Sequence, residues 1–591
     1  MDSYSVQSVS IGDKTFENVE MISIEEDVES FHSFQVYIDA RFIEPSAEMD
    51  SDRIAPEYAN MVGDFIGEAI SITIGLSNAE ASELVFKGIV THLNIQRTGD
   101  NSHTLFAFSG KGTPVSLLGS PRIKVYENKS IRDIISEKLG EHNVVEQGTI
   151  APNYSSPLEY IVQYQESDWQ FVKRLCGRLG EWFLFDGSQL HVGALPSGAT
   201  HALEFRKNLM RFNIGMQTQP SQNEVVSWSY DQVSNISKSF SETEVSSSNP
   251  YYTAAQEAGE SVYGIAGMTR DTQGHLYQSE EQELTVEVAA AKQSLSANMN
   301  LLSGMSLEPG LKPGDTVTVR EELETGGSVD YGTYLIRSVQ HSVEKDHYSN
   351  QFQAVPVGTL FPQYNGHAPA CEMQSAIVKE NYDPEGMGRL RVEFPWADGV
   401  LTPWVRMTTL SGGADKGFTY LPEIDEEVLV NFEGGNPERP IVVGSFFNGQ
   451  AKSGISDPDN NIKKLQTRAG HAITLDDTEG TEMITIEDPN GNTILINTSE
   501  DIISITSNSE LNLNAPIINI SGEDEVNISS ASVTIDGSDA VVVNSAQSVN
   551  VNSDQTLAMA GAQTADLTAA NVTVSADMVT SIEGTMVNIN S

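Results

Sequence analysis

The chain has 591 residues, too many for one hydrophobic core, so its length predicts several domains. It carries 34 basic and 82 acidic residues, a formal net charge of −48, and such a surface repels nucleic-acid phosphates and anionic membranes. Hydrophobic residues make up 39% of the chain and are spread along most of it, which excludes a disordered protein. We interpret the excess of acidic residues as a feature that keeps the protein soluble. Adaptation to an acidic habitat and binding to a basic partner are the alternatives.

Neither the cysteines nor the N-terminus indicates export by the general secretory route. Cys176 and Cys371 are far apart and are expected to be free thiols in a reducing compartment. The start, MDSYSVQSVS, lacks the basic and apolar regions of a signal peptide. No run approaches the ~20 apolar residues that cross a bilayer. We therefore expect a cytoplasmic protein that, if it leaves the cell, does so by another route.

The first 200 residues are predicted to be strands followed by two helices. Ser130 can cap a helix whose apolar face is Ile131, Ile134, Ile135 and Leu139. Ser167 and Gln170 have the spacing of a capping box that starts a second helix, beside whose apolar face Cys176 would pack. The clearest strands, rich in β-branched residues and separated by turn residues, are 69–76, 84–95 and 103–110.

Strands return between about 200 and 360. The segments 315–321 and 332–346 are predicted strands, and 279–302 is a predicted helix. Residues 235–262, rich in Ser, Glu and Thr, are predicted to be loop, and 361–375 has the character of a linker. We expect residues 1–365 to form one domain of two barrel-like parts with helices.

Residues 376–448 are predicted to form a small closed barrel of the oligonucleotide/oligosaccharide-binding (OB) type, because short strands recur about every ten residues between Gly, Pro and Asp turns. A polar linker, 449–464, follows. The six predicted strands are SAIVKE, GRLRVEFPW, TPWVRMTT, GFTYLP, EEVLVNFEG and RPIVVGSFF.

The C-terminal residues 465–591 contain a repeat of alternating apolar pairs. After Phe447 there is no aromatic residue, and after Arg468 there is no Lys or Arg. In the last hundred residues the pairs follow one another at seven or eight residues. The pairs include Ile484/Ile486, Ile494/Ile496, Ile503/Ile505, Leu511/Leu513, Ile518/Ile520, Val526/Ile528, Val533/Ile535, Val541/Val543, Val549/Val551, Leu557/Met559, Ala565/Leu567, Val572/Val574 and Val587/Ile589.

One chain of such units cannot close a core. Burying two Val-sized side chains contributes about 3–6 kcal/mol, whereas ordering eight residues costs roughly 8–16 kcal/mol in backbone entropy. Three intertwined copies would resolve the deficit, because their small apolar side chains meet on a narrow axis and each strand edge is paired. We expect a trimeric β-helix, or β-prism, of about fourteen layers, roughly 65–70 Å long at about 4.8 Å per layer. A single-chain β-solenoid with three units per coil is the alternative. The residues expected on the trimer axis are Ile528, Val533, Ile535, Val541, Val543, Val549, Val551, Leu557, Met559, Leu567, Val572 and Val574.

Three motifs resemble VgrG-type spike proteins of type VI secretion, which are related to the hub and spike proteins of T-even phage tails. GRLRVEFPW, TPWVRM and the run from YLPEIDEEVLVNF to PIVVGSFFNG are similar to the OB domain of that family. YIVQYQESDWQFVKRLCGRLGEWFLFDGSQLHVG resembles its hub signature, and the octad repeat resembles its spike. The Val-Gly repeat that names the family is poor here, with Asn and Thr in the middle positions.

The resemblance implies a structural, non-enzymatic protein that works as a homotrimer. Its hub would sit on a hexameric inner-tube protein within the baseplate, and sheath contraction would drive the spike through a target membrane. A PAAR-type tip protein and effectors would travel with it, from the cytoplasm of the producing bacterium into a target cell or the medium. The tip-protein contact is expected at Met586, Val587, Asn588, Ile589, Asn590 and Ser591.

Catalytic, cofactor and metal sites are not predicted. Asp488, Asn490 and Asn492 alternate like the start of a Ca²⁺ loop, but Ser499 stands where the bidentate Glu belongs, so a hairpin turn is favoured. His471 has no second His or Cys nearby. The functional alternatives are the spike of an extracellular or phage-tail-like injector, a cell-wall-degrading spike enzyme, and a trimeric adhesin.

Overall fold

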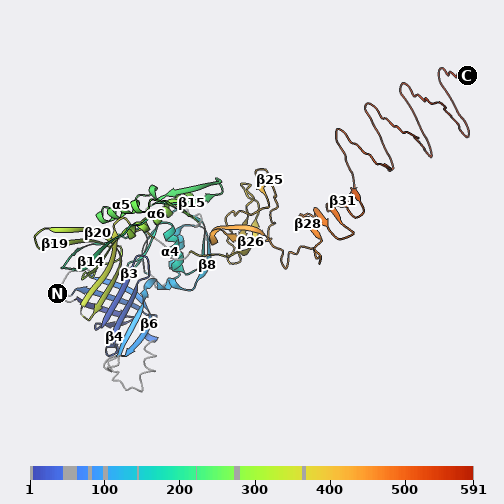
Figure 1. The fold of residues 1–591 in the computed structure, drawn as a ribbon. Coiled ribbons are helices and arrows are strands. Elements are labelled where there is room, and N and C mark those ends of the chain that lie inside the picture. The colour runs from blue at the N-terminus through green and yellow to red at the C-terminus, as the bar shows by residue number, and fades with distance from the viewer. Residues whose placement is uncertain are drawn as a thin grey trace. The chain divides into compact units, whose positions relative to one another are not determined.

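In the computed structural model the chain forms two compact units, Met1–Gly454 and Ile455–Ser591. The residues that the structure describes are 4–43, 63–76, 83–97, 104–142, 146–196, 198–220, 222–245, 247–271, 280–345, 347–362 and 368–589. Strands predominate in both units (Figure 1). The mainly β fold class expected from the sequence is confirmed.

A 13-stranded sheet curled into a half-barrel is the largest element of the first unit (Figure 1). Its N-terminal strands are β1 (Tyr4–Ile11), β2 (Lys14–Phe16), β3 (Met21–Asp27), β4 (Ser33–Asp39), β5 (Ala69–Leu76), β6 (Leu84–Arg97) and β7 (Thr104–Gly112). Its later strands are β13 (Thr200–Glu204), β14 (Leu209–Met216), β18 (Asn300–Ser306), β19 (Thr316–Glu322), β20 (Ser328–Glu344) and β21 (His347–Pro356). The strands predicted in these segments are confirmed.

Strands β3 and β20 join the two halves of this sheet, with Ile24 opposite His341. Beside this seam the carboxylate of Glu26 is fully buried between two imidazoles, with Oε1 3.4 Å from His32 Nδ1 and Oε2 3.4 Å from His341 Nε2. Burial alone would raise the pKa of Glu26, but hydrogen bonding to His32 and His341 outweighs it and lowers the pKa to about 2. The carboxylate therefore stays ionised inside the seam.

Both helices predicted from their caps are present. Helix α3 (Ile131–Gly140) starts where the Ser130 hydroxyl accepts from the amide of Asp133, and its predicted apolar face is buried. Helix α4 (Asp168–Arg178) starts with the predicted capping box of Ser167 and Gln170. The other elements up to residue 193 are α1 (Ala40–Ile43), η1 (Thr113–Leu118), β8 (Arg122–Lys129), β9 (Gln147–Ala151), β10 (Leu158–Glu166), β11 (Trp182–Phe185) and β12 (Leu190–Gly193).

The prediction that residues 235–262 are loop is wrong. Asn249 caps helix α5 by accepting from the amides of Tyr251 and Tyr252, and Pro250 occupies its first turn. Buried Tyr252 and Ala255 belong to the same apolar cluster as Met299 at the end of α6, so packing supplies the stability that composition did not suggest. The elements of this region are β15 (Asn223–Ser229), β16 (Ser234–Ser239), η2 (Phe240–Glu242), α5 (Pro250–Val262), β17 (Gly267–Arg270) and α6 (Glu280–Met299).

Helix α6 agrees with the predicted helix over 279–302, except that residue 279 lies outside the described residues and 300–302 belong to β18. The linker character assigned to 361–375 falls partly on residues 363–367, which are also outside the described residues. Strand β22 begins at Gln374, inside that predicted linker.

The predicted barrel contains a four-stranded sheet in the order β23-β22-β26-β27. TPWVRMTT contributes only the single bridges Leu390–Val405 and Met407–Val442. GFTYLP is not a strand beyond Gly417: a tight β24–β25 hairpin precedes it, and Phe418 and Tyr420 are exposed. The elements are β22 (Gln374–Glu380), β23 (Arg391–Glu393), β24 (Gly412–Gly413), β25 (Lys416–Gly417), β26 (Glu427–Phe432), η3 (Glu433–Gly435) and β27 (Pro440–Ser445).

A mixed apolar and ionic contact joins this small barrel to helix α4. The barrel's apolar core is continuous with Val125, Tyr160, Val162 and Tyr164 of β8 and β10. Glu438 lies 2.6 Å from Arg178 and 3.4 Å from Arg174, and Arg174 also forms a bidentate pair with Glu166. Burial would raise the pKa of Glu438, but the two guanidinium charges outweigh it and lower the pKa.

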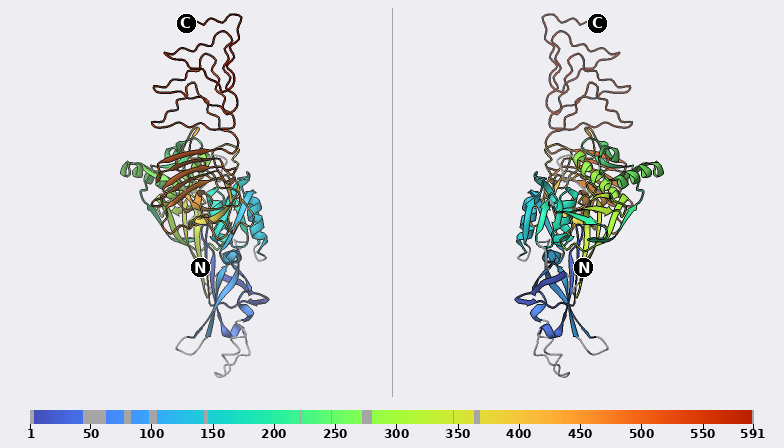
Figure 2. Two further views of the ribbon diagram at one scale, coloured as in Figure 1. Left: turned by 90° about the vertical axis from the view of Figure 1, so that its right-hand side faces the viewer. Right: turned by 90° about the vertical axis from the view of Figure 1, so that its left-hand side faces the viewer.

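The second unit starts with a five-stranded antiparallel meander in chain order. Its strands are β28 (Ile462–Gln466), β29 (Ala472–Asp476), β30 (Met483–Glu487), β31 (Thr493–Asn497) and β32 (Ile502–Thr506). Strand β28 begins within the predicted linker 449–464. Beyond β32, residues 507–589 run as an open coil that contains neither helix nor strand (Figure 2).

Candidate functional site

One face of the meander in the second unit is made of aliphatic side chains, and all of them except Ile484 are exposed. Strand register places these side chains directly opposite one another in two rows. Within this face Ile473 is 41% exposed, Ile494 40% and Ile503 70%. The rows are Leu475–Ile484–Ile496–Ile503 and Leu465–Ile473–Ile486–Ile494–Ile505.

The other face of the meander is mostly polar. Its central positions are Lys464, Thr474, Thr485, Leu495 and Ser504. A sheet that is apolar on one side and polar on the other is stable in water only when its apolar side is covered. The exposed apolar face is therefore a candidate assembly surface.

In the open coil, residues 507–589, apolar and polar residues continue to alternate, but the backbone forms no paired strands. None of the backbone–backbone hydrogen bonds of the structure falls within residues 507–589. The first member of a pair is about half exposed and the second more so: 53% for Val541 and 69% for Val543. All twelve residues predicted to lie on the trimer axis are exposed in the single chain, and they are Ile528, Val533, Ile535, Val541, Val543, Val549, Val551, Leu557, Met559, Leu567, Val572 and Val574.

Corners separate the apolar pairs and are built in two ways. At Ser545 and Ser553 the hydroxyl accepts from the amides two and three residues further along. At Gly537 and Gly561 a Cβ atom would lie 2.7 Å and 2.2 Å from the carbonyl oxygen three residues ahead, so no larger residue fits. Corners therefore recur with the period of the repeat and turn the chain after each short apolar segment.

The predicted tip residues continue the ladder to its end. Val587 is 46% and Ile589 82% exposed, the same asymmetry as in earlier pairs, and Met586 is exposed beside them. Asn588 donates to the sulfur of Met586 at 3.7 Å. Asn590 and Ser591 lie outside the described residues.

Two features of this surface escaped the sequence analysis. Leu465, Ile473 and Leu475 belong to the apolar face, although the repeat was followed only from Ile484; their alternation in KKLQ and AITLD was the available signal. Asn508 makes hydrogen bonds to the β30–β31 turn, and nothing in the repeat distinguishes it from other Asn residues.

The segment that alternates Asp488, Asn490 and Asn492 is a turn, as favoured. The carboxylate of Asp488 accepts from the amides of Asn490 and Asn492 and from the side chain of Asn492, and these bonds lower the pKa of Asp488. Over the ranges that the structure describes, no three His, Cys, Asp or Glu side chains are grouped to hold a metal ion.

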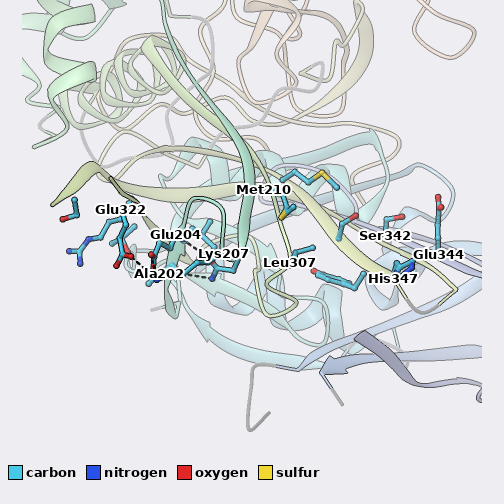
Figure 3. A pocket seen from close by; sticks show the side chains of 17 residues that line it. Ala202, Glu204, Lys207, Met210, Leu307, Glu322, Ser342, Glu344 and His347 are labelled. Carbon is cyan, nitrogen blue, oxygen red and sulfur yellow. Dashed lines mark hydrogen bonds and ion pairs between the residues drawn. The ribbon is translucent and has the colours of Figure 1, made fainter. Parts of the chain in front are cut away.

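A cavity of about 990 Å³ in the first unit is lined by the β13–β14 turn, by β18 and β19, and by the β20–β21 hairpin (Figure 3). At one end Lys207 forms ion pairs with Glu204 and, at 3.5 Å, with Glu322. Ser342, Glu344 and His347 stand at the other end (Figure 3). The ammonium group of Lys207 is thus paired with carboxylates of the same wall.

Two further observations bear on the chemistry of the chain. Cys176 and Cys371 are buried free thiols, and burial raises the pKa of Cys176, which makes it unreactive. Among the described residues, none of the helices combines the length and the apolar character that a bilayer crossing requires.

Two family models match the chain. A phage tail baseplate hub model covers residues 53–347, and a model of the OB domain of type VI secretion and phage-baseplate injectors covers residues 374–447. The half-barrel and the small barrel of the first unit correspond to these two models.

Curated relatives and solved structures agree with the family models. The chain is 21% identical over 483 residues to the type VI secretion system spike protein VgrG3 of Vibrio cholerae, covering 73% of this chain and 45% of that protein. It is 23% identical over 402 residues to the actin cross-linking toxin VgrG1 of Vibrio cholerae, covering 61% of this chain and 35% of that protein. The match thus spans less than half of each relative. In fold it is similar to a chain of the lidded Francisella PdpA-VgrG complex, with a TM-score of 0.54, 9% identity, and coverage of 85% of this chain and 80% of that one.

Proposed function

Since the chain belongs to the VgrG-type spike proteins of type VI secretion and related contractile injection systems, we propose that it acts as the homotrimeric needle of such a machine. The coarser role, a structural spike built on a baseplate hub, follows from the family. The trimer, its passage through a target membrane and its load are the parts that are proposed here.

The uncovered apolar surface of the second unit carries the proposal. The meander exposes two rows of aliphatic side chains, and the apolar pairs of the coil beyond it have no backbone-paired strand beside them. Covering a fully exposed aliphatic side chain stabilises by about 1.5–3 kcal/mol, so these half-exposed ones contribute roughly half as much each. Two further copies of the chain would cover the sheet face and supply the missing strand partners.

The repeat favours three chains over two. A short apolar segment followed by a Ser or Gly corner turns the chain once every seven or eight residues, which suits a triangular cross-section. The side chains that would meet on the axis are Val, Ile, Leu, Met and Ala, and no aromatic residue follows Phe447. A narrow three-fold axis accommodates these sizes.

Partners and location follow from the same proposal. The hub would sit on a hexameric inner tube among baseplate proteins, and a PAAR-type tip protein with effectors would bind at Met586–Ser591. The protein would assemble in the cytoplasm and leave by contraction. The role is mechanical, and type VI secretion and a phage-tail-like particle would use the same geometry.

Mass measurement of the full chain under native conditions tests the proposal. We expect three chains for the natural protein and for Thr485→Asp, which changes the polar face, but single chains for Ile486→Asp, which places a charge on the apolar face. A well-folded single chain of the natural protein, with its C-terminal quarter protected from proteases, would disprove the proposal.

A further inference from the structure

Directly after β32 the chain stops forming hairpins with itself. Between β31 and β32 it turns in four residues, 498–501, and pairs with itself again. Four residues, 507–510, also separate β32 from the next apolar pair, Leu511 and Leu513, so loop length permits another hairpin. Yet residues 511–513 form no strand with β32. Something other than loop length directs the chain away from its own sheet.

Asn508 is the residue that fixes this direction. Its backbone amide donates to Asn492 Oδ1 at 3.0 Å, and its side-chain amide donates to the carbonyl oxygen of Asn490. Both acceptors belong to the β30–β31 turn, which lies at the end of the sheet where β32 finishes, because Thr506 pairs with Thr493. A hairpin that extended the sheet would have to leave β32 on the opposite side. The two bonds therefore hold the chain on the wrong side for self-pairing.

Asp488 orients the side chain of Asn492, whose Oδ1 accepts from Asn508. The side-chain amide of Asn492 donates to Asp488 Oδ2 at 2.7 Å and its backbone amide donates to Asp488 Oδ1 at 2.9 Å. With its NH₂ group committed to the carboxylate, the amide oxygen of Asn492 is the atom left to accept from Asn508. The carboxylate of Asp488, the side-chain amide of Asn492 and the backbone amide of Asn508 thus form one chain of hydrogen bonds.

The consequence concerns the outer edge of β32. This edge keeps unpaired amides and carbonyls beside Ile503 and Ile505, and an open edge next to apolar side chains recruits another strand. Since the chain's own next segment is diverted, the strand must come from elsewhere. The next segment with the same alternation of apolar side chains is 511–513, here supplied by a second copy.

We propose that Asn508, held by Asn492 and Asp488, is the hand-over point at which each chain leaves its own sheet and gives its next strand to the β32 edge of a neighbouring copy. The inference rests on the proposed trimer and adds where self-pairing ends and intertwining begins. Residues 462–506 would form one face from one chain, and each later layer of a face would come from a different chain.

Disulfide trapping in the full chain tests the hand-over. Ser504→Cys and Asn512→Cys place thiols at the middle of β32 and of the next segment, and neighbouring strands bring such positions within disulfide range. The native Cys176 and Cys371 are buried and should not interfere. After oxidation, a denaturing gel without reductant should show covalently linked chains up to three. Ser504→Cys alone should give single chains.

The contrary outcome is a disulfide within one chain. If native mass still reports three chains, that result overturns the hand-over but not the trimer; if it reports one chain, the proposed function fails as well. Adding Asn508→Ala should reduce the linked fraction roughly five-fold, because the side-chain hydrogen bond to the carbonyl oxygen of Asn490 is lost. The matched Asn514→Ala, in an exposed stretch of the same coil, should leave it unchanged. Equal linking in both variants would show that Asn508 does not direct the chain.

Discussion

At the scale of single residues, close approaches and buried charges decide which side chains the fold tolerates. Gly561 lies where a Cβ atom would be 2.2 Å from the carbonyl oxygen of Thr564. Glu287 on α6 faces Asp271 and Glu283. A substitution at Gly561 or Glu287 should therefore change the stability of the unit that contains it.

Gly561→Ala should destabilise the second unit. The added methyl group would overlap the Thr564 carbonyl, so the corner would have to open, at a cost of more than about 1 kcal/mol per chain. Gly584→Ala is the matched control, because its added Cβ atom would lie 3.4 Å from the nearest atom, the carbonyl oxygen of Met586. Thermal unfolding should show a lower midpoint for the first variant only; equal midpoints would contradict the clash.

Stability of the first unit should fall as pH rises, through Glu287. Burial, the charge and hydrogen bond of Asp271, and Glu283 raise the pKa of Glu287 from 4.5 to about 8. The folded state thus binds this proton more tightly than the unfolded chain does. The proton's stabilising contribution is complete below pH 4.5 and is lost as pH approaches about 8.

Denaturant unfolding at several pH values across this window measures the effect. Glu287→Gln keeps the hydrogen-bond donor and cannot ionise, so its free energy of unfolding should depend less on pH than that of the natural chain. An unchanged pH slope would assign the effect to other groups.

At the scale of elements, helix α4 ties the hub to the small barrel. Its capping box fixes where the helix begins, and Arg174 and Arg178 on its later turns reach Glu438, which follows η3. The ion pairs are almost fully buried, so each charge depends on its partner for solvation.

Glu438→Gln should cost the first unit about 3 kcal/mol or more of stability, because two buried guanidinium groups lose a charged partner. Glu385→Gln is the control: Glu385 is 65% exposed and pairs with Arg389 at 3.4 Å, so its loss should change stability by less than about 1 kcal/mol. Denaturant titration compares the free energies of unfolding of the two variants. Similar losses of stability would show that the buried ion pairs of Glu438 stabilise the first unit no more than an exposed pair does.

At the scale of the whole molecule, charge opposes the assembly that apolar surface favours. Each chain carries a net charge of −48, and no Lys or Arg follows Arg468. Bringing several copies together therefore raises their mutual repulsion, which salt screens over about 8–10 Å at moderate ionic strength.

The thermal midpoint of the assembled protein should rise when NaCl increases from about 0.01 M to about 0.15 M, as the Debye length shortens. Scanning calorimetry at constant protein concentration measures it. A midpoint that falls with salt would mean that attractive ion pairs between chains outweigh the repulsion.

The sequence by itself determined the features that depend on near neighbours: the caps at Ser130 and Ser167, the strand alternation, the apolar ladder and the turn at Asp488. These features are encoded within a few residues, so periodicity and capping chemistry suffice to predict them.

Only the tertiary structure decided the rest. Helix α5 forms in a segment of loop-like composition because Tyr252 packs beside Met299. Arg174 meets Glu438 across 264 positions of chain, and Asn508 meets Asn490 across 18. Contacts between residues this far apart leave no local pattern, because the chain must first fold to bring the partners together.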